Sequence, residues 1–120
     1  MKYNIHTLKN GLRVILAPMP DTQTATVIVM TGTGSRYETE KENGLAHFLE
    51  HMFFKGTKKR PSAKKISEEL GGLGSHYNAF TAKDRTAYYA KVSSKNIDTA
   101  LDVISDIFLN STLPETEITK

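Results

Sequence analysis

The sequence predicts an α+β domain in which a mostly antiparallel sheet carries its helices on one face. Two observations lead to this fold class. The segments follow one another in the order β-β-β-α-α-β-β-α, and strands that are neighbours in the chain are joined by short turns, as antiparallel strands are. The length of 120 residues suits a single domain with a core of its own.

The first part of the chain predicts three strands. Residues 3–17 are expected to form a hairpin, because Asn10-Gly11 suits the pair of positive φ angles in a tight two-residue turn and the residues after it alternate. Residues 24–31 are rich in β-branched side chains and also alternate, so they predict a third strand. Gly32 and Gly34 are expected to end that strand.

Two helices are predicted in the middle of the chain. From residue 43 the apolar period changes from two to about 3.6, which predicts a helix over 43–54 that Gly56 ends. A second helix is expected to begin after Ser62, a suitable N-cap, and to end at Gly71-Gly72.

The remainder predicts a strand pair and a long helix. Residues 75–81 and 86–92 have strand character and are separated by a short turn. The helix that follows is expected to be capped by Ser93 or Ser94 and to end before Pro114. Its core-facing stripe would consist of Ile97, Leu101, Ile104 and Phe108.

The composition is that of an ordinary globular protein, with 38% hydrophobic and 24% charged residues. No cysteine is present, so disulfides, thiol chemistry and cysteine-ligated zinc are excluded, and a transition metal would need His, Asp or Glu. No stretch is long and apolar enough to cross a bilayer. The N-terminus shows neither an apolar nor an Arg/Ser-rich segment, so no targeting signal is predicted.

Residues 55–65 carry six basic side chains in eleven positions. A nucleic-acid patch is one interpretation of such a run. Nucleic-acid surfaces, however, usually place aromatic side chains among the charges, and none lies between positions 55 and 65. We therefore expect a solvated loop and helix face and no nucleic-acid partner.

The predicted helix over 43–54 gathers its polar side chains on one face. On a helical wheel His47, Glu50 and His51 lie together, opposite an apolar stripe of Leu45, Phe48, Leu49 and Met52. Two imidazoles four residues apart can reach one tetrahedral ion, and a carboxylate beside them stands where a general base must be. A solvated polar face that happens to carry two histidines explains the same spacing, and spacing alone leaves both interpretations open.

The segments around this helix resemble a known family. The stretch H-F-L-E-H at 47–51 has the H-x-x-E-H pattern of inverzincins. Further matches are G-S-R-Y-E at 34–38, F-K-G-T at 54–57, N-A-F-T at 78–81 and T-A-Y-Y at 86–89. In this order the motifs resemble the pitrilysin/insulinase family of zinc metallopeptidases, and most of all its mitochondrial processing peptidase-like bacterial branch.

The resemblance implies a fold, an activity and a site. The fold would be an α+β domain with a mostly antiparallel sheet, and the activity that of a zinc-dependent endopeptidase acting on peptides or presequence-like segments. His47 and His51 would bind Zn²⁺, and Glu50 would be the general base that activates the attacking water. Asn78, Ala79 and Thr81 would lie on a strand that pairs with the backbone of the substrate.

The family's third zinc ligand is a glutamate on a later helix, a position that falls beyond Lys120. Glu115 and Glu117 lie too early to replace it. We therefore expect residues 1–120 to be the N-terminal portion of a metallopeptidase domain, truncated before that ligand. Alone this portion is expected to be inactive, and to associate with itself or with the remainder of the enzyme.

A non-catalytic structural or interaction homologue of the same fold is the alternative function. Homologues of that kind usually lose the motif, whereas His47, Glu50 and His51 are all present here. Other residues of the matched motifs have simpler expected roles. Arg36 and Glu38 would tie down the loop before the helix, and one of Tyr88 and Tyr89 would lie in the core.

Overall fold

The computed structural model describes residues 1–120. Its strands are β1 (Asn4–Thr7), β2 (Arg13–Leu16), β3 (Thr24–Thr31), β4 (His76–Thr81) and β5 (Thr86–Ser93). Its α-helices are α1 (Leu45–Phe53), α2 (Ala63–Gly72), α3 (Ile97–Leu109) and the single turn α4 (Glu115–Ile118). Short 3-10 turns occupy Ser35–Tyr37, Glu40–Glu42 and Ser94–Asn96.

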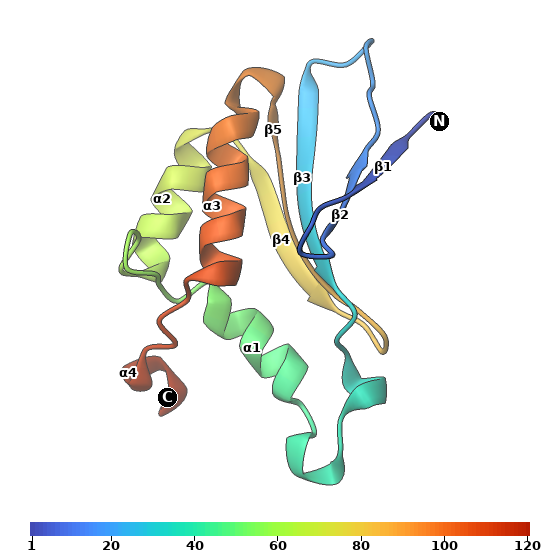
Figure 1. The fold of residues 1–120 in the computed structure, drawn as a ribbon. Coiled ribbons are helices and arrows are strands. Elements are labelled where there is room, and N and C mark those ends of the chain that lie inside the picture. The colour runs from blue at the N-terminus through green and yellow to red at the C-terminus, as the bar shows by residue number, and fades with distance from the viewer.

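The centre of the molecule is a three-stranded antiparallel sheet in the order β3-β5-β4. Helices α2 and α3 lie side by side over one face of this sheet, and α1 lies across its lower end beside β4 (Figure 1). The predicted α+β class, with an antiparallel sheet and helices on one face, is confirmed.

The core lies between the sheet and the helices α2 and α3. Strand residues alternate between the two faces, so every second side chain of β5 points at the helices, and α3 presents a buried stripe to meet them. The buried cluster consists of Ile66, Leu70, Tyr88, Ala90, Val92, Ala100, Val103, Ile104 and Ile107. Of the stripe predicted for α3, Ile104 is buried and Phe108 packs against the core, whereas Ile97 and Leu101 are 42% and 51% exposed. The buried side of the helix is therefore shifted from the prediction, and Val103 and Ile107 join Ile104 in the core.

The opposite face of the sheet is open. Ile28 and Met30 on β3 are 54% and 55% exposed, and Phe80 on β4 is 40% exposed. The register places these side chains next to one another, since Met30 and Phe80 both pair with Ala87 of the central strand. The sheet is thus covered on one side only.

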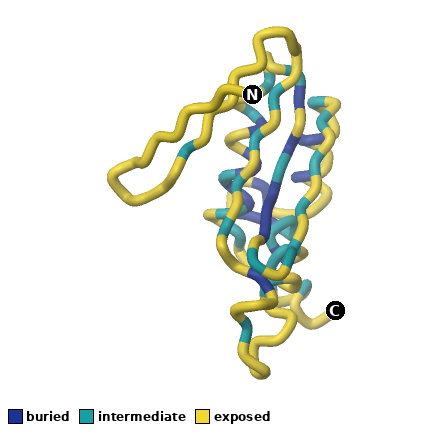
Figure 2. Tube along the Cα trace, turned by 90° about the vertical axis from the view of Figure 1, so that its right-hand side faces the viewer, coloured by how far each residue is buried: buried dark blue, intermediate teal, exposed yellow.

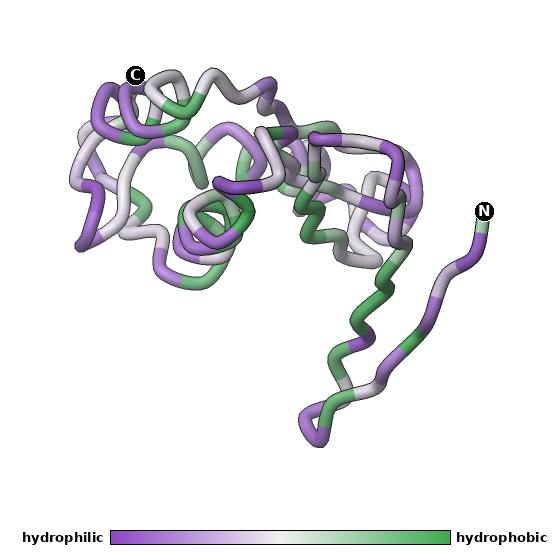
Figure 3. Tube along the Cα trace, turned by 90° about the horizontal axis from the view of Figure 1, so that it is seen from above, coloured by the Kyte–Doolittle hydropathy of each residue, from purple (hydrophilic) through white to green (hydrophobic).

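Strands β1 and β2 form a separate two-stranded sheet that projects from the body (Figures 2 and 3). The hairpin is confirmed, but the two-residue turn is wrong. The Gly11 amide donates to the Leu8 carbonyl oxygen, and Leu8 and Leu12 close the loop. Only Gly11 has a positive φ angle, +88°. Lys9, Asn10 and Gly11 therefore form a three-residue loop, in which a type I turn is followed by a left-handed glycine.

Two predicted helix starts differ from the structure. The first helix begins at Leu45, because Gly44 has a φ angle of +88° and stands outside the helix. The third helix is capped neither by Ser93 nor by Ser94. A 3-10 turn over Ser94–Asn96 intervenes, and Asn96 occupies the N-cap without a side-chain hydrogen bond. The Ser62 cap of α2 is confirmed, since its side chain accepts a hydrogen bond from the Lys65 amide.

Candidate metal centre

Helix α1 carries His47, Glu50 and His51, and its start is fixed by a carboxylate from the preceding loop. Glu38 accepts hydrogen bonds from the amides of Gly44 at 2.7 Å and Ala46 at 2.8 Å. These two hydrogen bonds, to Ala46 and to Gly44, lower the pKa of Glu38. They satisfy amides that have no partner within a helix, and they place a negative charge at the positive end of the helix dipole. The predicted structural role of Glu38 is confirmed.

The two histidine side chains of α1 converge. Their Nε2 atoms lie 3.1 Å apart, and both residues are exposed. Two nitrogens that bind one zinc ion at tetrahedral geometry, each about 2.0–2.1 Å from the metal, lie about 3.3 Å apart. The imidazole pair therefore fits a zinc ion with only a small adjustment. A neutral imidazole pair is also the donor set that zinc prefers when cysteine is absent.

Glu50 is half-buried and turns toward the sheet. Its Oε2 atom accepts a hydrogen bond from the hydroxyl of Thr81, the last residue of β4. Tyr88 of β5 lies near enough to Glu50 for the charge of the carboxylate to act on its hydroxyl. Burial raises the pKa of Tyr88, and the negative charge of Glu50 raises it further. The carboxylate thus occupies a corner between α1, β4 and β5, on the same helix as the imidazole pair.

No group of three or more His, Cys, Asp or Glu side chains lies close enough together to hold a metal ion. Glu117 is engaged elsewhere, because it pairs with Lys55 at 3.5 Å and with Lys120 at 2.6 Å. Two imidazole nitrogens thus meet at one point, and no carboxylate completes a group of three around them.

The strand that carries Asn78, Ala79 and Thr81 is at the edge of the sheet. In the order β3-β5-β4, only one side of β4 is paired, so the other edge can accept an extended peptide. The three residues do not share a face. Ala79 and Thr81 are half-buried on the helix side, whereas Asn78 is exposed and its side-chain oxygen accepts a hydrogen bond from the Ala79 amide.

The division of α1 into an apolar and a polar face is only partly correct. Met52 is buried, but Leu45 and Phe48 are 46% and 41% exposed. Phe54 follows the helix and packs against Tyr77 and Tyr88. Because α1 touches the sheet mainly through β4, the side turned inward includes Glu50 as well as apolar residues.

The basic run at 55–65 is largely consumed by ion pairs within the chain. Arg60, whose side chain is 3% exposed, pairs with Glu69, Asp102 and Asp106 at 2.7, 2.7 and 2.9 Å. Lys59 also pairs with Asp102, at 2.6 Å. The expected solvated face is confirmed for Lys58, Lys59, Lys64 and Lys65, which are exposed, and is wrong for Arg60, which is buried.

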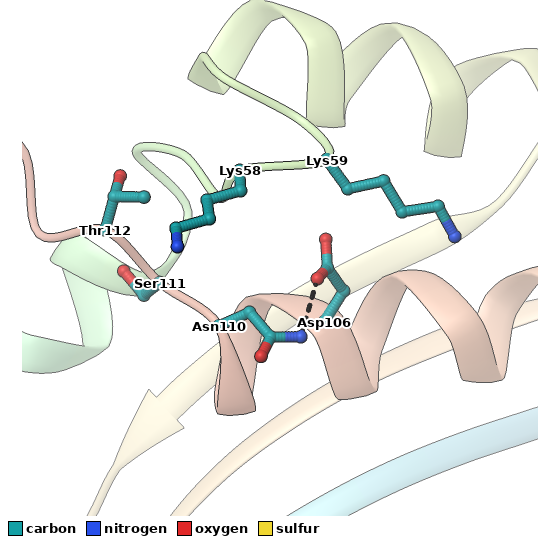
Figure 4. A pocket seen from close by; sticks show the side chains of 6 residues that line it. All are labelled: Lys58, Lys59, Asp106, Asn110, Ser111 and Thr112. Carbon is teal, nitrogen blue, oxygen red and sulfur yellow. Dashed lines mark hydrogen bonds between the residues drawn. The ribbon is translucent and has the colours of Figure 1, made fainter.

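A hollow beside this network lies at the C-terminal end of α3 (Figure 4). Its lining is entirely polar, and Asn110 donates a hydrogen bond to Asp106 inside it. None of the predicted site residues lines it. The lining residues are Lys58, Lys59, Asp106, Asn110, Ser111 and Thr112.

Two features escaped the sequence-based predictions. The Arg60 network carried no local signal, because its partners on α3 are more than 40 residues away in the chain. The turn before α1, in contrast, has a readable signal. Thr39 and Glu42 form a capping box, and the pattern T-E-K-E at 39–42 is the usual signature of that motif. The fourth-strand histidine His76 is exposed and lies near Tyr89 of β5.

No helix of the structure has the length and apolar character needed to span a bilayer.

Tyr88 is buried and Tyr89 is half-buried, which confirms that one of the two tyrosines belongs to the core.

Comparison with known proteins supports the resemblance. The chain is 48% identical over 118 residues to an uncharacterized zinc protease of Rickettsia felis. The aligned region covers 98% of this chain and 28% of that protein. It is 52% identical over 109 residues to the mitochondrial-processing peptidase subunit beta of Lentinula edodes, covering 91% of this chain and 23% of that subunit. The chain thus spans about a quarter of the length of these curated relatives.

A solved structure has the same fold. The crystal structure of a protease from Helicobacter pylori superposes with a TM-score of 0.92 at 34% identity, covering 98% of this chain and 28% of that one. The family model described as Insulinase (Peptidase family M16) matches residues 13–120. With nearly the whole sequence matched, and with the H-x-x-E-H helix in place, the chain belongs to the insulinase family of peptidases, M16.

Proposed function

We propose that this chain carries the metal-binding and proton-transfer residues of a zinc-dependent endopeptidase. His47 and His51 would hold the ion, and the 3.1 Å separation of their Nε2 atoms is the observation that carries the proposal. A bound zinc ion would supply Lewis acidity, which lowers the pKa of water and polarises a peptide carbonyl. The third ligand expected beyond Lys120 stays a prediction.

Glu50 acts as the general base in this proposal. Its carboxylate lies beside the imidazole pair, where it can take a proton from the attacking water and pass it to the leaving amine. The Thr81 hydroxyl occupies Oε2, which leaves Oε1 for the water. The half-buried corner around Glu50 excludes part of the bulk solvent and strengthens these hydrogen bonds.

The free edge of β4 binds the substrate in an extended form. A peptide that adds to this edge would form main-chain hydrogen bonds, which are independent of the peptide sequence, as a processing enzyme with varied targets requires. The path along Asn78 and Ala79 leads to Thr81 and so to Glu50, which would bring the scissile bond to the base. The compartment of this chain stays a prediction, with the bacterial cytoplasm expected and the mitochondrial matrix as the alternative. The similar proteins include a zinc protease of Rickettsia felis and a mitochondrial-processing peptidase subunit.

Isothermal titration with zinc tests the ligand assignment. His47→Ala and His51→Ala should each abolish measurable binding, because a single imidazole remains. His76→Ala is the matched control, since His76 is an exposed histidine on β4 away from the pair. We expect the dissociation constant of the unaltered chain to lie well above the nanomolar range, because only two protein ligands converge. Equal zinc binding by the His47→Ala variant would refute the assignment.

Hydrolysis of a quenched peptide tests the activity. Residues 1–120 alone should show no turnover with zinc present, since the described residues supply an incomplete ligand set. Turnover by this chain that disappears in Glu50→Gln would show that the two imidazoles suffice, and turnover that survives in Glu50→Gln would overturn the role of Glu50.

A further inference from the structure

The Glu50 carboxylate is close to the imidazole pair but is not directed at it. Glu50 follows His47 by three positions, and residues at that spacing are neighbours on a helix surface. Carboxylate oxygens are good zinc ligands, so a freely rotating Glu50 could itself complete a three-ligand site. In the structure, however, neither Glu50 nor any other acidic side chain forms such a group with His47 and His51.

A hydroxyl from the sheet accounts for this orientation. Thr81 donates a hydrogen bond to Glu50 Oε2, and this contact is made between two half-buried side chains that are 31 residues apart. It draws the carboxylate toward the end of β4. Hydrogen bonds to a charged acceptor are stronger than those between neutral groups, so this one can hold a flexible glutamate in one rotamer.

The backbone that carries the Thr81 hydroxyl is held in place by the sheet. Thr81 pairs with Thr86 of β5, and Thr86 in turn pairs with Thr31 of β3, so the three threonines form a row across the sheet. Thr86 is buried and donates a hydrogen bond to the Thr33 carbonyl oxygen. β-branched side chains have few rotamers, so the donor at position 81 has little freedom to turn away.

We propose that Thr81 is a positioning residue for Glu50, in addition to lying on the strand that would pair with substrate. Its hydroxyl keeps the carboxylate out of the metal coordination sphere and turned toward the edge of β4, where a proton must be moved. This inference rests on the proposed function, since it gives Glu50 the role of base. In this inference the Thr81 side chain contacts the general base Glu50 and not the substrate peptide.

Metal-free protein provides the first test. Side-chain ¹³C NMR of the unaltered chain should show Glu50 in a single rotamer, and the Thr81 hydroxyl proton should exchange slowly. Thr81→Val, which removes the hydroxyl at nearly constant shape, should average the Glu50 rotamers, while Thr81→Ser should retain the single rotamer. An unchanged Glu50 signal in Thr81→Val overturns the proposal. Should the Thr81→Val variant not fold, fast exchange of the Thr81 hydroxyl in the unaltered chain overturns it equally.

Metal binding provides the second test. With the carboxylate released, Thr81→Val should bind zinc more tightly than the unaltered chain, by about tenfold, and the Co²⁺ absorption spectrum should change. Both effects should vanish in Thr81→Val combined with Glu50→Gln. Equal affinity and an identical spectrum in Thr81→Val would overturn the claim that Thr81 holds Glu50 off the ion. A failure of the zinc assignment itself would appear separately, as unchanged binding in His47→Ala, and would leave the NMR result to decide the role of Thr81.

Discussion

Arg60 connects α2 and α3 through its side chain. Its buried guanidinium joins Glu69 on α2 to Asp102 and Asp106 on α3, and Thr57 adds a hydroxyl hydrogen bond to Asp106. A buried charge of this kind is tolerated only when it is fully paired. All the buried side-chain polar atoms of the chain have a hydrogen-bond partner, which is consistent with a well-satisfied network.

Removing the Arg60 side chain should destabilise the chain strongly. Arg60→Met keeps most of the side-chain volume but leaves Asp106, itself 8% exposed, without its cation. We expect a loss of about 3 kcal/mol in the free energy of unfolding, measured by urea denaturation. Lys58→Met is the control, since Lys58 is exposed and forms no ion pair, and it should change stability by less than about 0.5 kcal/mol. A loss below about 1 kcal/mol for Arg60→Met would contradict this role.

The same network predicts a loss of stability in acid. The hydrogen bond from Arg60 lowers the pKa of Glu69, and those from Lys59 and then Arg60 lower the pKa of Asp102. Burial by itself would raise the pKa of Asp106, but hydrogen bonds from Thr57, Asn110 and Arg60 outweigh it and lower the value.

A carboxylate with a lowered pKa stabilises the fold fully above its ordinary pKa, and this contribution disappears as the pH falls through the lowered value. Stability should therefore be constant from pH 7 to about pH 5 and fall below about pH 4.5. Urea midpoints measured between pH 7 and pH 3 would show this. Arg60→Met should flatten the decline, and an equally steep decline in that variant would assign it to other carboxylates.

At the scale of elements, α1 depends on the loop that leads into it. Gly34 lies against the turn between β4 and β5, and the Arg36 amide donates to the Lys83 carbonyl oxygen at 2.8 Å. Glu38 then binds the first amides of the helix. The loop is therefore fixed at both ends, and it delivers the helix with His47 and Glu50 to the edge of the sheet.

Gly34→Ala should disturb this connection. A Cβ atom at position 34 would lie 2.4 Å from the Ala82 carbonyl oxygen and 2.6 Å from the Lys83 backbone, so the two segments must separate. We expect a cost of about 2 kcal/mol in unfolding free energy and faster amide exchange at Arg36. Gly32→Ala is a matched control two residues away, because a Cβ there meets nothing within 4 Å. Equal stability of the two variants would refute the close approach.

At the scale of the whole molecule, two apolar surfaces are uncovered. One is the outer face of the sheet, formed by Ile28, Met30 and Phe80, and the other is the projecting β1–β2 hairpin, where Ile5 and Ile15 are 56% and 65% exposed. A two-stranded hairpin is only marginally stable in water by itself. Large exposed apolar patches favour association with another protein surface.

The chain should therefore self-associate as its concentration rises. Sedimentation velocity should show a shift from monomer toward dimer, and Ile28→Lys should weaken the dimer by placing a charge in the apolar patch. Thr26→Lys is the control, since Thr26 lies on the same face of β3 but outside the apolar patch. A strictly monomeric chain at the highest concentration, or equal association in both variants, would contradict this prediction.

The elements of the fold could be predicted closely because their signals are local. Ser62 and Gly71-Gly72 mark the ends of α2 correctly, and the alternation over 24–31 gave the bounds of β3. The two histidines at 47 and 51 were likewise predicted to converge, since helix geometry alone places side chains four residues apart next to one another. The hairpin loop was misjudged because a single dipeptide, Asn10-Gly11, suits several loop lengths.

The sequence by itself determined the element order, the paired histidines with their adjacent glutamate, and the family. The elements and the histidine pair depend on residues within one or two helical turns of one another. The family depends on the order of short motifs along the chain. Only the tertiary structure decided which side of α1 faces inward, that Thr81 binds Glu50, and that Arg60 is buried among three carboxylates. These contacts join residues 9 to 46 positions apart, and their geometry depends on how helices pack on the sheet, which no local pattern encodes.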